Sequence, residues 1–199
     1  MTGTLYPFLR RDPADLTAST AAKARESLEL RLRVLDELGP ALAACATDVA
    51  AALREGGRLY AFGNGGSSTD AESVAALFTA RDLPAISLAC DTALVTALGN
   101  DIGFEVVFAR QLAALGGPGD VAVALSTSGG SANVLRGLDE ARRTGMVTVG
   151  FAGSGGGRMA SERLAEHLFV VPSSSVHRIQ EAQATLYHLL VELVSADAR

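Results

Sequence analysis

Apolar positions along the chain recur with two periods, one typical of helices and one typical of strands. Between residues 15 and 38, leucines at positions 28, 32, 35 and 38 follow helical spacing, which predicts an amphipathic helix. Gly39-Pro40 interrupts this run, so we expect that helix to end there and a second one to cover residues 41–54. The first part of the chain is therefore predicted to be a pair of helices.

Short apolar runs alternate with helical segments in the remainder of the chain. The predicted strands cover residues 58–62, 83–88, 121–125, 146–151 and 168–171. The predicted helices cover residues 67–80, 91–98, 104–115, 132–143, 158–164 and 179–195. Such alternation is typical of βαβ units, so we expect an α/β fold with a five-stranded parallel sheet covered by helices on both faces.

Length and composition indicate one domain. A chain of 199 residues with 48% hydrophobic content can bury a full core. The N-terminal helical pair, within residues 1–56, carries a longer apolar stripe than one sheet face requires. We therefore expect that pair to form an oligomer interface and residues 57–199 to form the α/β core.

Charge and cysteine content exclude several classes of protein. The net charge of −5 argues against a nucleic-acid groove, which needs a clustered positive field. Cys45 and Cys90 stand apart from each other without a C-x-x-C pair, so neither a disulfide framework nor a structural zinc site is predicted. No segment has the length and apolar character of a signal peptide core or membrane span, and we expect a cytoplasmic protein with no membrane partner.

A hydroxyl-rich segment, Ser126–Ser131, lies between a predicted strand and a predicted helix. It contains four hydroxyls and two glycines. A helix N-terminus offers unpaired backbone N–H groups and a favourable dipole, and glycines let an anion approach closely. The segment therefore predicts a phosphate-binding loop that acts through neutral donors, since it contains no lysine or arginine.

A second junction of the same kind, Gly63–Ser68, follows the first predicted strand. Glycines and serines after strands also serve simply to end strands and cap helices, and that reading stands beside the functional one. Two such junctions in one open α/β sheet favour a ligand with one phosphate and a polar body. Neither loop matches a P-loop or the dinucleotide-binding fingerprint.

Four segments in this order resemble the sugar isomerase (SIS) family, in particular its phosphoheptose isomerase group. They are Gly63–Ser67, Gly99–Phe104, Ser126–Val134 and Arg178–Glu181. The resemblance implies a three-layer αβα domain, a homotetramer and a site for sedoheptulose 7-phosphate or a similar sugar phosphate.

The resemblance also implies roles for individual residues. It places Asn64 and Asp101 near the sugar hydroxyls, and Gln180 matches a glutamine of the family's last helix. The residues that it assigns to the phosphate are Ser67, Ser126, Thr127, Ser128 and Ser131.

The catalytic positions match the family only in part. A ketose–aldose isomerisation through an enediol needs a base over the carbon and a group that manages the oxygen protons. In the family these are a glutamate on the helix after the first loop and a histidine on the last helix, and a further histidine helps to bind zinc. His188 matches the last-helix histidine, whereas Leu77 stands at the glutamate position and Ser73 at the metal-histidine position. The resemblance makes zinc possible, but its ligand positions are partly lost, so we expect no cofactor and no metal site.

Glu181 and His177 are the candidate substitutes for the missing base. Glu181 equally suits a first-turn glutamate that favours the helix dipole, and His177 equally suits a surface residue; a pair of His177 with His188 is a further alternative. Two functions stay open at this point. One is a sugar-phosphate isomerase, and the other is a non-catalytic phosphosugar-sensing regulator or adaptor, similar to the SIS relative that associates with the bacterial replication initiator.

Overall fold

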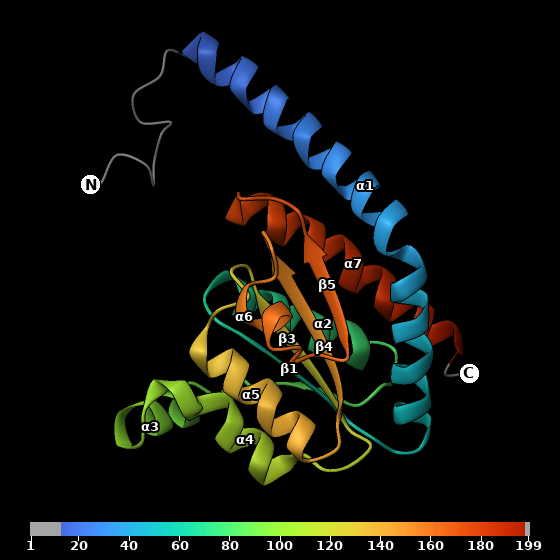
Figure 1. Ribbon diagram of the computed structural model, residues 1–199, viewed down its shortest axis with the longest axis vertical. Coiled ribbons are helices and arrows are strands. Elements are labelled where there is room, and N and C mark those ends of the chain that lie inside the picture. Colours follow the sequence, from blue (N-terminus) through green and yellow to red (C-terminus); the bar gives the residue numbers. More distant parts are fainter. Residues whose placement is uncertain (1–12, 198–199) are drawn as a thin grey trace.

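The computed structural model describes residues 13–197. They form three layers, in which a parallel sheet lies between two layers of helices (Figure 1). The helices are α1 (Pro13–Arg54), α2 (Gly66–Thr79), α3 (Thr92–Asp101), α4 (Val107–Leu115), α5 (Ala132–Arg143), α6 (Gly157–Ser161) and α7 (Val176–Asp197), with a 3₁₀ turn η2 (Phe104–Val106). The strands are β1 (Leu59–Gly63), β2 (Ala85–Ser87), β3 (Val121–Ser126), β4 (Val147–Gly153) and β5 (His167–Val171). The predicted five-stranded parallel sheet is confirmed, in the order β2-β1-β3-β4-β5.

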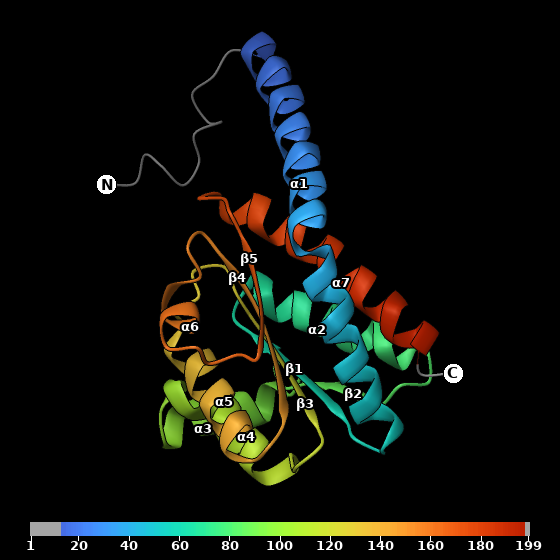
Figure 2. The ribbon, with the colours of Figure 1, turned by 45° about the vertical axis from the view of Figure 1, so that its right-hand side comes forward.

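Alternate residues of the central strands serve two separate apolar layers. In β3, Val121, Val123 and Leu125 pack with α1, α2 and α7, whereas Ala122 and Ala124 pack with α4, α5 and α6. Every residue of β1 and β3 is buried, as expected for parallel strands covered on both faces. Figure 2 shows the two groups of helices on opposite sides of the sheet.

The predicted break at Gly39-Pro40 is wrong, because α1 is one helix of 42 residues with Pro40 inside it. Proline removes one backbone hydrogen bond and crowds the preceding turn, which bends a helix without necessarily ending it. α1 does change direction part-way along its length (Figure 1). Val34 before the proline and Leu42 and Cys45 after it are all buried in one core, so tertiary packing outweighs the local cost.

The strand order places a topological switch between β1 and β3. From β1 the chain continues to β2 on one side, and from β3 it continues to β4 on the other. In open α/β sheets, ligands bind outside the carboxyl ends of the strands at this point. The two loops predicted from the sequence follow these two strands.

Candidate functional site

The two predicted phosphate loops lie next to each other at the carboxyl edge of the sheet. β1 and β3 pair in parallel with Gly63 opposite Leu125, so Asn64 and Ser126 are the next residues at the same edge. α2 begins at Gly66 and α5 at Ala132. The arrangement brings two helix N-termini, with their unpaired N–H groups, to one place.

The hydroxyls of the second loop converge. Ser126 Oγ lies 3.2 Å from Ser131 Oγ and 3.5 Å from Ser128 Oγ. Ser126 is buried, Thr127 and Ser131 are half-buried, and Ser128 is exposed. This cluster offers rotatable hydroxyl donors at the start of a 12-residue helix, which is the chemistry that a phosphate monoester requires.

A reciprocal amide pair joins the two loops. Asn64 Nδ2 donates to Asn133 Oδ1 and Asn133 Nδ2 donates to Asn64 Oδ1, both at 2.8 Å. Asn133 Oδ1 also accepts from the backbone N–H of Val134. The predicted sugar-binding residue Asn64 therefore also fixes the spacing of the loops. Asn133 was not among the predicted site residues, although it lies within the segment Ser126–Val134 that resembles the family.

Backbone packing holds the second loop against the start of α6. Gly129 has a positive φ of 60°, and a Cβ added there would overlap the carbonyl oxygen of Gly156. The carbonyl of Gly129 accepts a hydrogen bond from the N–H of Met159 at 2.8 Å. Only glycine satisfies this close approach, so the position of the loop depends on residue 129.

α7 contributes Gln180 to the same region. A Cβ added to Gly66 would overlap the side-chain amide of Gln180, so this amide lies against the first turn of α2. Ser67, whose N–H bonds to the carbonyl of Asn64 at 3.0 Å, is buried beside it. The structure thus brings Gln180 together with the first loop.

Asp70 and Tyr187 form a polar contact between α2 and α7, one turn beyond the loop. Tyr187 Oη donates to Asp70 Oδ1 at 3.2 Å. Burial raises the pKa of Asp70. The hydrogen bond from Tyr187 lowers this pKa by a smaller amount, so the net shift is upward. Burial, and then the charge and hydrogen bond of Asp70, raise the pKa of Tyr187 to about 12. Gln183 is fully buried on the same helix, α7. Neither its amide atoms nor Asp70 Oδ2 has a hydrogen-bond partner, and burying polar atoms without a partner lowers the stability of the fold.

The substitution Asp70→Asn is expected to flatten the pH dependence of stability. Because the pKa of Asp70 is raised in the fold, its contribution to stability is full below the unfolded pKa of about 3.9 and is lost as the pH rises through the folded pKa. The melting temperature of the native chain should therefore fall, relative to the variant, as the pH rises above about 4. Circular dichroism melts between about pH 3.5 and 7 measure this difference. Glu72→Gln, at an exposed carboxylate of the same helix, is the control, and parallel curves for native and Asp70→Asn chains would contradict the assignment.

The candidate catalytic residues lie apart from one another. His177 and His188 are both exposed on the unbroken helix α7, where 11 residues separate them by about 16 Å along the axis. The structure therefore does not bring them together within one chain. His188 stacks on Tyr187 with ring centroids 5.2 Å apart. Asp101 is exposed at the end of α3 and accepts a hydrogen bond from Asn100.

Glu181 faces α1 and not the phosphate loops. Its carboxylate accepts hydrogen bonds from Ser27 and Arg178. Burial raises the pKa of Glu181, but these hydrogen bonds and the charges of Arg178 and Arg31 outweigh it, so the net shift is downward. A carboxylate held in its charged form by an ion pair is a weak general base.

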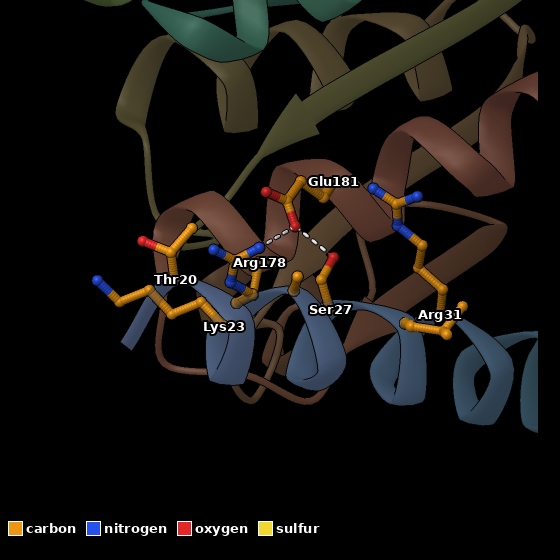
Figure 3. A pocket seen from close by; sticks show the side chains of 8 residues that line it. Thr20, Lys23, Ser27, Arg31, Arg178 and Glu181 are labelled. Carbon is orange, nitrogen blue, oxygen red and sulfur yellow. Dashed lines mark hydrogen bonds and ion pairs between the residues drawn. The ribbon is translucent and has the colours of Figure 1, made fainter. Parts of the chain in front are cut away.

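Figure 3 shows the pocket of about 420 Å³ in which Glu181 lies, between α1 and the start of α7. Lys23, Arg31 and Arg178 supply three positive charges against this single carboxylate. No residue of either phosphate loop lines the pocket. It is therefore separate from the predicted sugar-phosphate site.

Comparison with known proteins identifies the fold. The sequence model of the SIS domain family matches residues 24–153. The chain belongs to the SIS domain family. The phosphoheptose isomerase of Aquifex aeolicus is 46% identical to this SIS protein over 176 residues, which cover 85% of this chain and 91% of the relative. The phosphoheptose isomerase of Desulfovibrio desulfuricans is 46% identical over 178 residues, or 86% and 84% of the two chains.

A solved structure gives the same result for this SIS protein. The phosphoheptose isomerase from Neisseria gonorrhoeae superposes with a TM-score of 0.87 at 36% identity, covering 91% of this chain and 99% of that one. The predicted resemblance to the phosphoheptose isomerase group and the predicted α/β fold are both confirmed. Within residues 13–197, no helix combines the length and apolar character that a bilayer span requires.

The positions that the resemblance assigned to zinc do not fit that ion in this SIS protein. The hydroxyl of Ser73 donates to the carbonyl of Thr69 at 2.9 Å. Leu77 packs against the apolar core and has no ligand atom.

Proposed function

We propose that this protein binds a sugar phosphate at the junction of the two loops. The observation that carries this proposal is the convergence of the Ser126, Ser128 and Ser131 hydroxyls with two helix N-termini at the switch point of the sheet. Helix N-termini and hydroxyl donors stabilise a phosphate without a cationic side chain. The polar groups of Asn64 and Gln180 border the same junction and suit the hydroxyls of a sugar.

The ligand that we propose is sedoheptulose 7-phosphate or a close analogue. Support comes from relatives named phosphoheptose isomerase at 40–46% identity and from the high structural similarity to such an enzyme. Thr127 and Ser67 complete the proposed phosphate site, and Asp101 is proposed to reach the sugar. We propose a cytoplasmic location, which suits a protein that acts on a sugar phosphate of this kind.

We propose that the protein works as a homo-oligomer, with a tetramer as the expected state. The N-terminal part of α1 extends beyond the sheet and its covering helices (Figures 1 and 2). Leu28 and Leu32, one turn apart on that part, are 59% and 55% exposed. Apolar side chains at this spacing suit a helix that packs on another copy of the chain.

Isomerisation by this site is the first candidate function, by similarity to the relatives. Proton transfer would then fall to His188, with His177 or Glu181 in a supporting role. The pairing of Glu181 with Arg178 and Ser27 favours His188 over Glu181. Because His177 and His188 lie about 16 Å apart along one helix, their cooperation would require two copies of the chain.

Phosphosugar sensing without catalysis is the second candidate function, and Leu77 favours it. An apolar side chain at the position that the family gives to its base removes a proton acceptor, while the phosphate loops stay intact. Among the described residues, no carboxylate makes a hydrogen bond to either phosphate loop. A protein of this kind would change its assembly or its partner on binding the sugar.

One experiment decides between the two candidates. The full-length chain is titrated with sedoheptulose 7-phosphate by calorimetry, and conversion is followed by phosphorus or carbon NMR. Binding with turnover establishes the isomerase. Binding without turnover establishes the sensor, and the absence of binding contradicts both.

The substitution Leu77→Glu tests whether a general base at this position is all that the site lacks for isomerisation. If binding occurs without turnover, introducing this carboxylate is expected to produce measurable conversion by NMR, because a positioned base contributes about 10²–10⁴-fold. Leu77 is only partly buried, so the glutamate can stay solvated at its tip. Ala76→Glu, one residue earlier and exposed, is the matched control and should leave the chain inactive.

A further inference from the structure

Three metal-ligating side chains meet at the opposite edge of the sheet from the phosphate loops. Asp48 comes from α1, Glu166 immediately precedes β5, and His167 is the first residue of β5. One ligand atom of each lies within 4.8 Å of the other two, and His167 Nε2 is 2.9 Å from Asp48 Oδ2. Ligands that bind one ion at about 2.0–2.2 Å lie about 3–4 Å apart, so a small closing movement of these side chains would bring all three onto a single metal ion.

The charges of this cluster are not balanced by the protein. Asp48 and Glu166 place two carboxylates close together, and within residues 18–197 no lysine or arginine forms an ion pair with either. Among the described residues, the only side-chain partner of either carboxylate is His167, which contacts Asp48. A divalent cation would remove the repulsion between the carboxylates and accept the imidazole nitrogen as a third ligand.

Asp48 lies on a helix and His167 on a strand, and Glu166 is fixed by its backbone next to that strand. The backbone N–H of Glu166 donates to Thr148 Oγ1 at 2.9 Å, and Thr148 is 2% exposed. His167 lies opposite Val149 in the sheet register, and its side chain is 15% exposed. Ligands on a helix and a strand are positioned more precisely than ligands on loops.

A buried thiol lies on α1 close in sequence to Asp48. Cys45 lies one turn before Asp48, is fully buried and makes no hydrogen bond in the described structure. Burial, and then the charges of Asp48 and Glu166, raise the pKa of its thiol to about 12. The Cys45 sulfur is not one of the ligand atoms that lie within 4.8 Å of one another, so the donors are one imidazole and two carboxylates, which zinc accepts.

We propose that Asp48, Glu166 and His167 bind one zinc ion that joins α1 to the edge strand β5. One imidazole nitrogen and two carboxylate oxygens hold the ion, and water completes its shell on the open side. The site is separate from the sugar-phosphate loops, since residues 166 and 167 precede a strand whereas the loops follow parallel strands. Sequence reasoning missed it because 118 or more positions separate the ligand on α1 from the other two.

Zinc titration of the full-length chain, without an added histidine tag and after EDTA treatment, tests the proposal. The native chain is expected to bind one zinc ion by calorimetry and to gain melting temperature with zinc. His167→Gln and Asp48→Asn should each weaken zinc binding by about 100-fold or more, since even the loss of an outer-shell partner costs about 10–100-fold. Both positions are partly solvent-exposed, so circular dichroism should show folded variants.

Two control variants make the outcome specific. Asp36→Asn, an exposed carboxylate on the same helix, and His188→Gln should both keep native zinc affinity. No zinc binding by the native chain, or equal binding by His167→Gln, would overturn the proposal. Zinc binding lost in His188→Gln but kept in His167→Gln would also overturn it, because the ion would then lie near α2 and α7.

Hydrogen exchange tests whether the ion stabilises the contact between α1 and β5. Zinc is expected to slow the exchange of the β5 backbone amides in the native chain and to leave them unchanged in His167→Gln. This measurement needs no assumption about the affinity of the ion. Equal exchange of these amides with and without saturating zinc would contradict a role of the ion in holding β5.

Discussion

Gly129→Ala is expected to lower the free energy of unfolding by about 3 kcal/mol and to abolish sugar-phosphate binding. Residue 129 has a φ of 60°, in the left-handed region that costs about 1–2 kcal/mol for a residue with a Cβ. The new methyl group would also overlap the backbone carbonyl of Gly156, which cannot rotate away. Relief of this overlap separates the loop from α6 and displaces Ser128 and Ser131. Urea unfolding measures the stability, and calorimetry with sedoheptulose 7-phosphate measures the binding.

The neighbouring glycine provides a matched control. Gly130→Ala places the same methyl group one residue further on, where the nearest atom is Ser128 Oγ at 3.7 Å and φ is not positive. This variant should stay within about 0.5 kcal/mol of the native chain. Equal losses of stability in the two variants would show that the close approach between the loop and α6 is not what holds the loop.

Ser126→Ala is expected to weaken sugar-phosphate binding by about 10- to 100-fold with little loss of stability. One hydrogen bond to a charged acceptor contributes about 1.5–3 kcal/mol, and each 1.4 kcal/mol corresponds to a factor of ten in affinity. Ser126 Oγ lies between the Ser128 and Ser131 hydroxyls, so its loss affects the centre of the proposed phosphate site. Calorimetry measures the affinity, and thermal melting measures the stability.

Ser161→Ala is the control for this prediction. Ser161 is an exposed serine at the end of α6, outside both loops, and its substitution should leave affinity and stability unchanged. Native affinity in Ser126→Ala, with the fold intact, would remove the hydroxyl cluster from the proposed site. A large loss of stability would instead assign Ser126 a structural role.

Local patterns in the sequence were sufficient to predict most of the fold. The helix predicted over residues 132–143 is α5 with the same bounds, because a hydroxyl-rich turn precedes it and Arg142 and Arg143 complete its last turn. All five strands were found, since buried parallel strands are short apolar runs between turn residues. Pro40 misled the prediction because the balance between its local cost and the packing of α1 on the core is a property of the whole fold.

The contacts that define the site join residues far apart in the sequence. Asn64 and Asn133 are 69 positions apart, and Asp70 and Tyr187 are 117 positions apart. No periodicity carries information on which pairs will meet, so only the hydroxyl-rich loops, whose chemistry is local, were predicted from the residues alone. The orientation of Glu181 toward α1 could not be predicted for the same reason, because it depends on hydrogen bonds from both Ser27 and Arg178.

Hydroxyls, amides and main-chain N–H groups make up both loops, and none of these gains or loses a proton near neutrality. The affinity for a phosphate monoester should therefore depend on pH mainly through the ligand itself, whose second ionisation falls at about pH 6. Ionic strength would have a correspondingly weak influence, because no cationic side chain of these loops is available for dissolved salt to screen. The proposed phosphate site is therefore expected to keep nearly the same affinity as the salt concentration changes.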